Sequence, residues 1–166
     1  MNKLISTLDA QFAALHARSC ALVRVVPAEF LYRQPRAALL SAEKAVGASA
    51  VYSCGEHLLR SAASVEQTFG GVTANLWDDP FEWTLPETLS TPPLVEEYLN
   101  EVEATRRRGF ALVSSDAELA KEIAVPSGEM KPLAALFVET LARASHLQGR
   151  AFAVFRLFSD ARLPPL

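Results

Sequence analysis

An all-α fold, arranged as a four-helix bundle, is the fold class that this sequence predicts. Four long stretches carry apolar side chains at steps of three and four residues, which places them on one face of a helix. No stretch shows the strict alternation of apolar and polar residues that marks a half-buried strand. The chain has 166 residues, the size of one ordinary domain, so we expect residues 1–166 to form a single helical domain.

Composition excludes several classes of protein. Half of the residues are hydrophobic and the net charge is only −3, which excludes a disordered chain. The isoelectric point of about 5.6 argues against a nucleic-acid partner. No uncharged apolar run approaches the roughly 18 residues that cross a bilayer, and Asp9 interrupts any signal-peptide core. We therefore expect a cytoplasmic protein with no membrane partner, in which Cys20 and Cys54 are small buried side chains.

The first half of the chain predicts two long helices. The first covers residues 3–26 and ends at Pro27. A connection follows over residues 27–47, with a short helical piece around residues 36–44. The second helix begins at Ala48 or Ser53 and runs to Phe69, where Gly70 and Gly71 are expected to end it.

A long loop over residues 72–93, which contains both tryptophans, is expected to separate the second and third helices. The third helix begins at Thr91 and Pro92 and extends to Val113, and its Arg106–Arg108 run is expected to lie on a solvated face. After a short capped turn over residues 115–119 and a loop over residues 125–128, the fourth helix covers residues 132–158.

Three short motifs resemble a known family. They are Val26-Pro27-Ala28-Glu29 with Gln34-Pro35, the run from Tyr52 to Arg60, and the run from Ser145 to Arg150 followed by Phe155-Arg156-Leu157. In order and spacing these motifs resemble the DinB/YfiT-like superfamily of four-helix-bundle proteins, and the resemblance extends over essentially the whole chain. It implies the same bundle fold.

The resemblance also implies a site, which this sequence alters. Members of the family commonly bind a divalent metal through one histidine of the second helix and two of the fourth, and some are thiol-dependent transferases or isomerases. The corresponding positions here are Arg60, Arg143 and Leu147. Leucine has no donor atom and arginine stays protonated, so these positions cannot bind a cation. We therefore predict a divergent, metal-free member without a cofactor. The alternative is a zinc or nickel site made of His16, His57 and His146.

The altered positions suggest an anion site instead. If the family fold holds, Arg60 and Arg143 face a cleft between the second and fourth helices, flanked by Ser53, His57, His146 and Arg150. Two guanidinium groups suit a carboxylate or phosphate ligand. The alternative is that each arginine pairs with a nearby carboxylate, such as Glu56 or Glu139, and closes the cleft.

These observations leave several functions open. The first is binding of a small, possibly anionic ligand or a protein partner without metal chemistry. The second is a metal-dependent thiol S-transferase or isomerase with an unrecognised set of ligands, so whether the protein is an enzyme stays open. A homodimer is also expected, with apolar residues such as Phe152 and Val154 at its interface. The loop over residues 72–93 covers either the cleft or that interface.

Overall fold

The computed structural model describes residues 3–35, 51–82 and 84–165, and this part of the chain is mostly helical, as the sequence predicts. The four long helices are α1 (Lys3–Val25), α3 (Cys54–Ala74), α4 (Pro92–Ala111) and α6 (Leu133–Arg156). The short elements are α2 (Ala28–Leu31), the 3-10 helix η1 (Pro80–Glu82), α5 (Asp116–Leu119), and the strands β1 (Glu122–Ala124) and β2 (Met130–Pro132).

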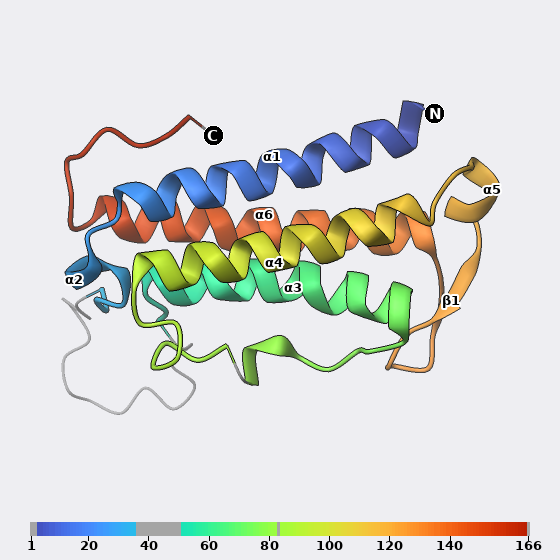
Figure 1. The fold of residues 1–166 in the computed structure, drawn as a ribbon, viewed down its shortest axis with the longest axis horizontal. Coiled ribbons are helices and arrows are strands. Elements are labelled where there is room, and N and C mark those ends of the chain that lie inside the picture. Colours follow the sequence, from blue (N-terminus) through green and yellow to red (C-terminus); the bar gives the residue numbers. More distant parts are fainter. Residues whose placement is uncertain (1–2, 36–50, 83, 166) are drawn as a thin grey trace.

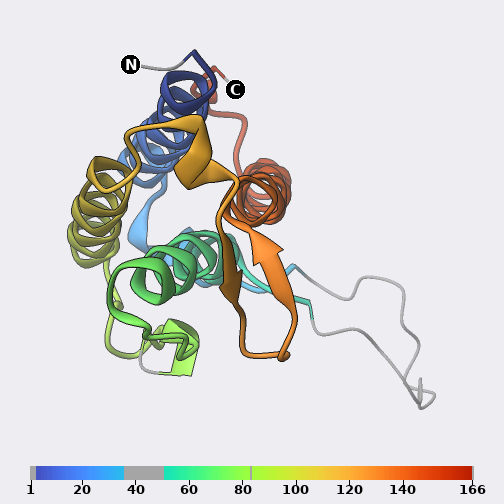
Figure 2. The same ribbon diagram turned by 90° about the vertical axis from the view of Figure 1, so that its right-hand side faces the viewer.

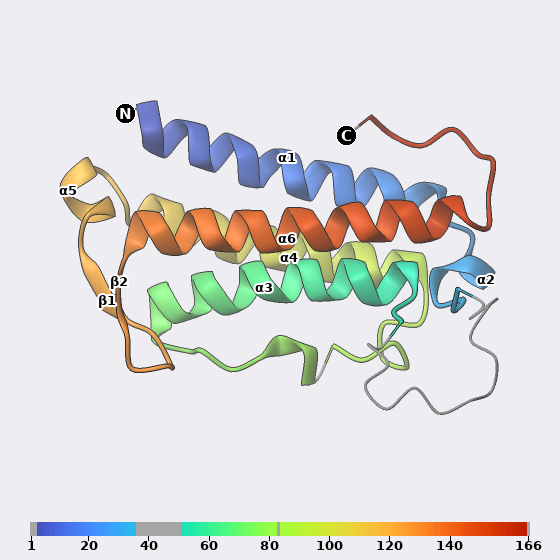
Figure 3. The ribbon, with the colours of Figure 1, turned by 180° about the vertical axis from the view of Figure 1, so that it is seen from behind.

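The four long helices lie side by side (Figures 1 and 2). Helix α3 packs against α6 and α4, and α1 packs against the same two helices from the other side. Helices α1 and α6 run in one direction and α3 and α4 in the other (Figures 1 and 3). Because α3 and α4 are parallel neighbours, the connecting segment returns along the length of α3 through η1 before α4 begins (Figure 1). That return brings Trp77 and η1 against α3.

One phenylalanine from each long helix meets at the centre of the core. Phe12 of α1, Phe69 of α3, Phe110 of α4 and Phe137 of α6 are all buried, and their ring centroids are 4.9 to 6.3 Å apart in the contacting pairs. Aromatic pairs at these separations add to the free energy of burial. All four residues belong to the predicted apolar stripes, so the inward faces of the four helices are confirmed.

The predicted end of the second helix is wrong. Helix α3 continues through Gly70 and Gly71 to Ala74 and ends at Asn75, which adopts the left-handed conformation with φ of 55°. Gly71 lies inside the helix for a packing reason, because a Cβ atom there would lie 2.4 Å from the Trp77 ring. The start is confirmed at Ser53, which caps the helix reciprocally with Glu56.

Other boundaries follow the sequence closely. Helix α1 ends two residues before Pro27, α4 begins with Pro92 in its first turn, and α5 is the predicted capped turn. Thr91 precedes α4 without a side-chain capping bond. The helical piece expected around residues 36–44 lies outside the described residues.

Two short features were not expected. Helix α2 follows Pro27 directly, and β1 pairs antiparallel with β2, with Ile123 opposite Lys131. Each strand has only three residues, and a half-buried central residue lies between two exposed ones. An alternation this short cannot be recognised in the sequence. The prediction that the chain has no strand is therefore wrong over residues 122–132.

Two predictions about exposure are also wrong. Phe152 is 3% exposed and Val154 is half-buried against the core, so neither forms an exposed apolar patch. In the Arg106–Arg108 run, only Arg107 and Arg108 are exposed, whereas Arg106 is buried between α4 and α1. The helical period explains this, because Arg106 follows Val102 by four residues on the inward face of α4.

Candidate functional site

Several of the predicted site residues lie at the beginning of α3. The carboxylate of Glu56 is there already hydrogen-bonded to neighbouring groups. Glu56 accepts hydrogen bonds from the Ser53 backbone N–H and the Ser53 hydroxyl, both at 2.7 Å, and from Gln34 Nε2 at 2.9 Å. These bonds outweigh burial and lower the pKa of Glu56. Glu56 is therefore a capping carboxylate, and Ser53 serves the cap.

Arg60 lies between two aromatic rings. Its guanidinium carbon is 4.1 Å from the centre of the Tyr52 ring and 3.8 Å from that of the Phe81 ring, a double cation–π contact. Its Nε is buried and has no hydrogen-bond partner among the described residues. No ion pair joins Arg60 to Glu56 in this part of the chain, so the expectation that a nearby carboxylate neutralises Arg60 is wrong.

His57 lies one turn before Arg60 and is buried, with 5% of its surface exposed. The edge of one ring meets the face of the other where His57 contacts Tyr52, with centroids 5.6 Å apart. Burial lowers the pKa of His57, and the positive charges of Arg150, Arg60 and His146 lower it further. Its Nδ1 is buried and has no partner among the described residues. The Glu56 carboxylate acts on this pKa in the opposite direction, but the net shift is downward, so His57 is a neutral imidazole at pH 7.

Four of the predicted site residues thus lie near one another, where α3 packs against α6. Arg60 and His57 belong to α3. His146 and Arg150 are exposed side chains of α6, and their charges contribute to lowering the pKa of His57. We call these four residues the basic cluster. Sequence reasoning missed Tyr52 and Phe81 as the aromatic residues that hold Arg60. Tyr52 stands just before the helix, but nothing in the sequence indicates that Phe81 returns to α3.

Arg143 is the second arginine of the expected anion site. Arg143 is exposed and lines a pocket between α3, α6 and the turn of the β1–β2 hairpin, to which Arg60 does not contribute. Glu139 pairs with Lys131 at 2.8 Å, and no described carboxylate pairs with Arg143. Leu147 is half-buried on α6, one turn after Arg143. The pairing of Arg143 with Glu139 is therefore corrected, and Arg60 does not line the pocket that Arg143 borders.

The three histidines do not assemble into a metal site. His57 and His146 belong to the basic cluster, whereas the charges that act on His16 are those of Glu103, Arg107, Arg106 and Glu96, all on α4. Within residues 3–35, 51–82 and 84–165, no group of three or more histidine, cysteine or acidic side chains could hold a metal ion. The alternative ligand set of His16, His57 and His146 is thus not brought together.

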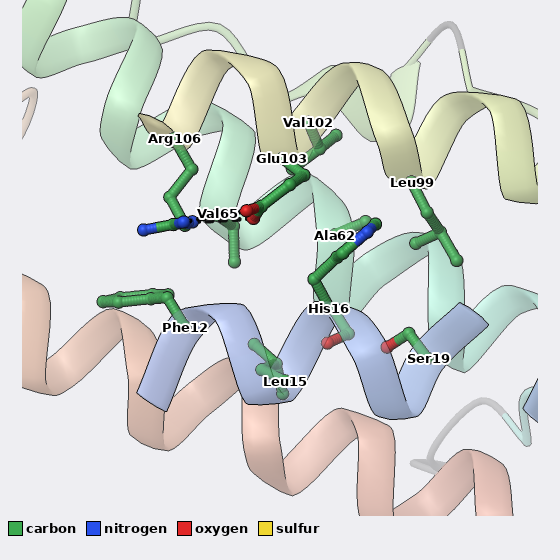
Figure 4. Close-up of a pocket in the computed structure, with 11 residues that line it drawn as sticks. Phe12, Leu15, His16, Ser19, Ala62, Val65, Leu99, Val102, Glu103 and Arg106 are labelled. Carbon is green, nitrogen blue, oxygen red and sulfur yellow. Dashed lines mark hydrogen bonds and ion pairs between the residues drawn. The ribbon is translucent and has the colours of Figure 1, made fainter. Parts of the chain in front are cut away.

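His16 instead borders a small interior cavity between α1, α3 and α4 (Figure 4). The cavity has a volume of about 30 Å³, enough for a water molecule but not for a substrate. Its polar lining comes from His16, Ser19, Ser61, Glu103 and Arg106. Figure 4 shows the Glu103 carboxylate directed at the Arg106 guanidinium, with hydrogen bonds of 2.7 and 2.8 Å.

Neither cysteine is suited to act as a nucleophile. Burial raises the pKa of Cys20 to about 11 and that of Cys54 to about 12, so both thiols are protonated at neutral pH. The sulfur of Cys20 lies 3.6 Å from His16 Nε2, but the thiol remains buried. Thiolate chemistry at either residue is therefore disfavoured.

Comparison of the chain with protein-family models, curated protein sequences and solved structures finds no match. Among the described helices, none combines the length and apolarity that a membrane crossing requires. The function is therefore argued from the basic cluster itself.

Proposed function

We propose that this protein binds a small anionic ligand, a carboxylate or a phosphate, at the basic cluster on the α3–α6 face, without metal chemistry. One observation carries the proposal: two buried nitrogens of the cluster, His57 Nδ1 and Arg60 Nε, have no hydrogen-bond partner among the described residues. Buried polar groups in folded proteins are nearly always paired, so an orphan pair within one turn of a helix favours a missing ligand.

The charge balance supports an anion. Guanidinium groups are cationic at neutral pH, and the Glu56 carboxylate, which also acts on His57, is engaged in the α3 cap. The ring contacts to Tyr52 and Phe81 fix the Arg60 fork before a ligand arrives. A preorganised guanidinium suits carboxylate or phosphate groups and loses little entropy on binding.

The donor set disfavours the metal-dependent alternative. The charges of Arg150, Arg60 and His146 act on His57, and positive charges at this place repel a divalent cation. The thiol transferase thus has no observation in its favour, although it remains the alternative that the family resemblance raises.

The proposal includes a fold family, an assembly and a location. We infer that the four packed helices are a four-helix bundle of the DinB/YfiT-like kind, that the protein is a cytoplasmic homodimer, and that residues 1–166 are one domain. The motif order in the sequence supports the family. Light scattering on the purified chain tests the dimer, and a monomeric mass would contradict it.

The test is isothermal titration calorimetry with inorganic sulfate, inorganic phosphate and succinate. Sulfate and phosphate separate a tetrahedral anion from the carboxylate, and all three are small anions that can approach from the side of the exposed His146 and Arg150. We expect saturable binding of at least one anion, weakened about tenfold in Arg150→Gln, because a hydrogen bond to a charged group contributes about 1.5–3 kcal/mol. Arg60→Lys keeps the charge but loses the fork, and we expect it to weaken binding as well.

The matched control is Arg162→Gln, which removes an exposed arginine near the C-terminus. This variant should bind as the parent does. If all four proteins bind equally weakly and without saturation, the affinity is nonspecific and the proposal is wrong.

A further inference from the structure

A second pocket lies away from the basic cluster, where the β1–β2 hairpin meets the two helices. Figure 2 shows the hairpin beside α3 and α6. The pocket has a volume of about 200 Å³, and residues of α3, α6, the hairpin turn and the segment after α3 line it. This is below the roughly 300 Å³ at which pockets accept drug-sized ligands, so it suits a smaller molecule.

One of the lining residues is a tryptophan that the surrounding chain holds in place. Trp77 packs over Gly71, where a Cβ atom would lie 2.4 Å from its ring. Its Nε1 donates to Asn75 Oδ1 at 3.1 Å, and its backbone carbonyl accepts from Gln67 Nε2 at 2.9 Å. Trp77 is half-buried and lines the pocket, and an indole ring is a flat apolar surface that suits a planar ligand.

The floor and the rim supply polar groups. Thr68 and Thr140 share one hydrogen bond of 2.7 Å between their hydroxyls, which leaves one hydroxyl proton without an acceptor among the described residues. Arg143 lines the pocket, is exposed, and has no ion pair within the part of the chain that the structure describes.

The charge on this pocket limits its ligand to one negative group. Lys131 and Glu139 also line it and pair at 2.8 Å, and Lys131 lies 3.9 Å from Glu129 as well, so Arg143 is the charged lining residue without an ion pair among the described residues. Because the Glu139 carboxylate is on the same wall, a second negative group on the ligand would be repelled.

We propose that the pocket between α3, α6 and the β1–β2 turn binds a small aromatic monocarboxylate, with its ring against Trp77 and its carboxylate on Arg143. This site shares no residue with the basic cluster, so the two proposals stand or fall separately.

Benzoate is the probe, in the full-length chain carrying Trp83→Phe. This background leaves Trp77 as the only tryptophan, since the chain has two. We expect benzoate to change the Trp77 fluorescence saturably. Benzamide has the same ring without the charge, acetate has the charge without the ring, and phthalate adds a second carboxylate. All three should bind at least about tenfold more weakly than benzoate.

Arg143→Gln should weaken benzoate binding about tenfold, whereas Arg162→Gln should leave it unchanged. Because Arg143 is exposed and unpaired among the described residues, its replacement should leave the melting temperature near that of the parent. Equal binding of benzoate and benzamide, or an unchanged affinity in Arg143→Gln, overturns the proposal. Loss of benzoate binding in Arg150→Gln would also overturn it, because the ligand would then belong to the basic cluster.

Discussion

The Arg106 guanidinium is only 3% exposed, and it joins α4 to α1. It donates to both oxygens of Glu103, which is 7% exposed, and to Asp9 of α1. A buried charge pair of this kind is weak evidence for net stabilisation, but the loss of one partner leaves the other charge buried and unpaired.

We predict that Arg106→Met lowers the free energy of unfolding by about 3 kcal/mol or more, because the buried Glu103 carboxylate loses two hydrogen bonds. Arg107→Gln is the matched control. Arg107 donates to the same carboxylate from a side chain that is 72% exposed, so its loss should cost less than about 1 kcal/mol. Urea denaturation of both variants measures the difference, and equal losses would contradict the burial argument.

Two histidines make stability depend on pH in the mildly acidic range. Burial is the largest cause that lowers the pKa of His16 and of His57 below the ordinary value near 6.5. The unfolded chain then binds these protons more readily than the folded chain. The contribution to stability is therefore complete above pH 6.5 and is lost as the pH falls toward the lowered values.

We predict that the free energy of unfolding falls between pH 7.5 and pH 5.5, and that His57→Gln makes this fall shallower. Denaturation at several pH values measures both slopes. In parallel, nuclear magnetic resonance titration of the imidazole signals should place the midpoint of His57 below 6.5. A midpoint above that value would show that an anion already occupies the site or that the burial of His57 is wrong.

At the scale of elements, two glycines inside helices have opposite roles. Gly71 in α3 allows the Trp77 ring to pack against the helix backbone, whereas a Cβ atom at Gly149 in α6 would meet nothing within 4 Å. Alanine is the better helix former by about 1 kcal/mol, so packing alone decides the outcome of each substitution.

We predict that Gly149→Ala raises the free energy of unfolding by about 1 kcal/mol, while Gly71→Ala lowers it by about 1 kcal/mol or more because the new methyl group displaces Trp77. Thermal unfolding followed by circular dichroism measures the stabilities, and the fluorescence of Trp77 reports the displacement. A stabilising Gly71→Ala would mean that the segment after α3 moves aside easily.

At the scale of the whole molecule, the arrangement of donors predicts the response to metal. Untagged protein incubated with zinc, nickel and manganese and then desalted should carry much less than one metal ion per chain by elemental analysis. Its melting temperature should be the same with and without metal, because an ion stabilises the folded state only if it binds that state. Near-stoichiometric metal would contradict the metal-free proposal and revive the thiol-transferase alternative.

The sequence by itself determined the helices and their inward faces. Phe12, Phe69, Phe110 and Phe137 each belong to an apolar stripe that repeats with the helical period within one helix, and burial of each stripe is a local consequence of the pattern. Helix starts at Ser53 and Ser115 were also readable, because a capping box needs only residues three positions apart.

Only the tertiary structure decided which side chains meet between elements. Phe81 reaches Arg60 because the segment after α3 returns along that helix, and Gly71 stays helical because Trp77 covers it. Arg60 and Arg143 were expected on the two flanks of one cleft, but their surroundings differ, since Arg60 packs between Tyr52 and Phe81 whereas Arg143 borders the pocket at the hairpin. The helical period is set by the backbone of each segment. Contacts between side chains far apart in the sequence depend instead on how the segments pack against one another.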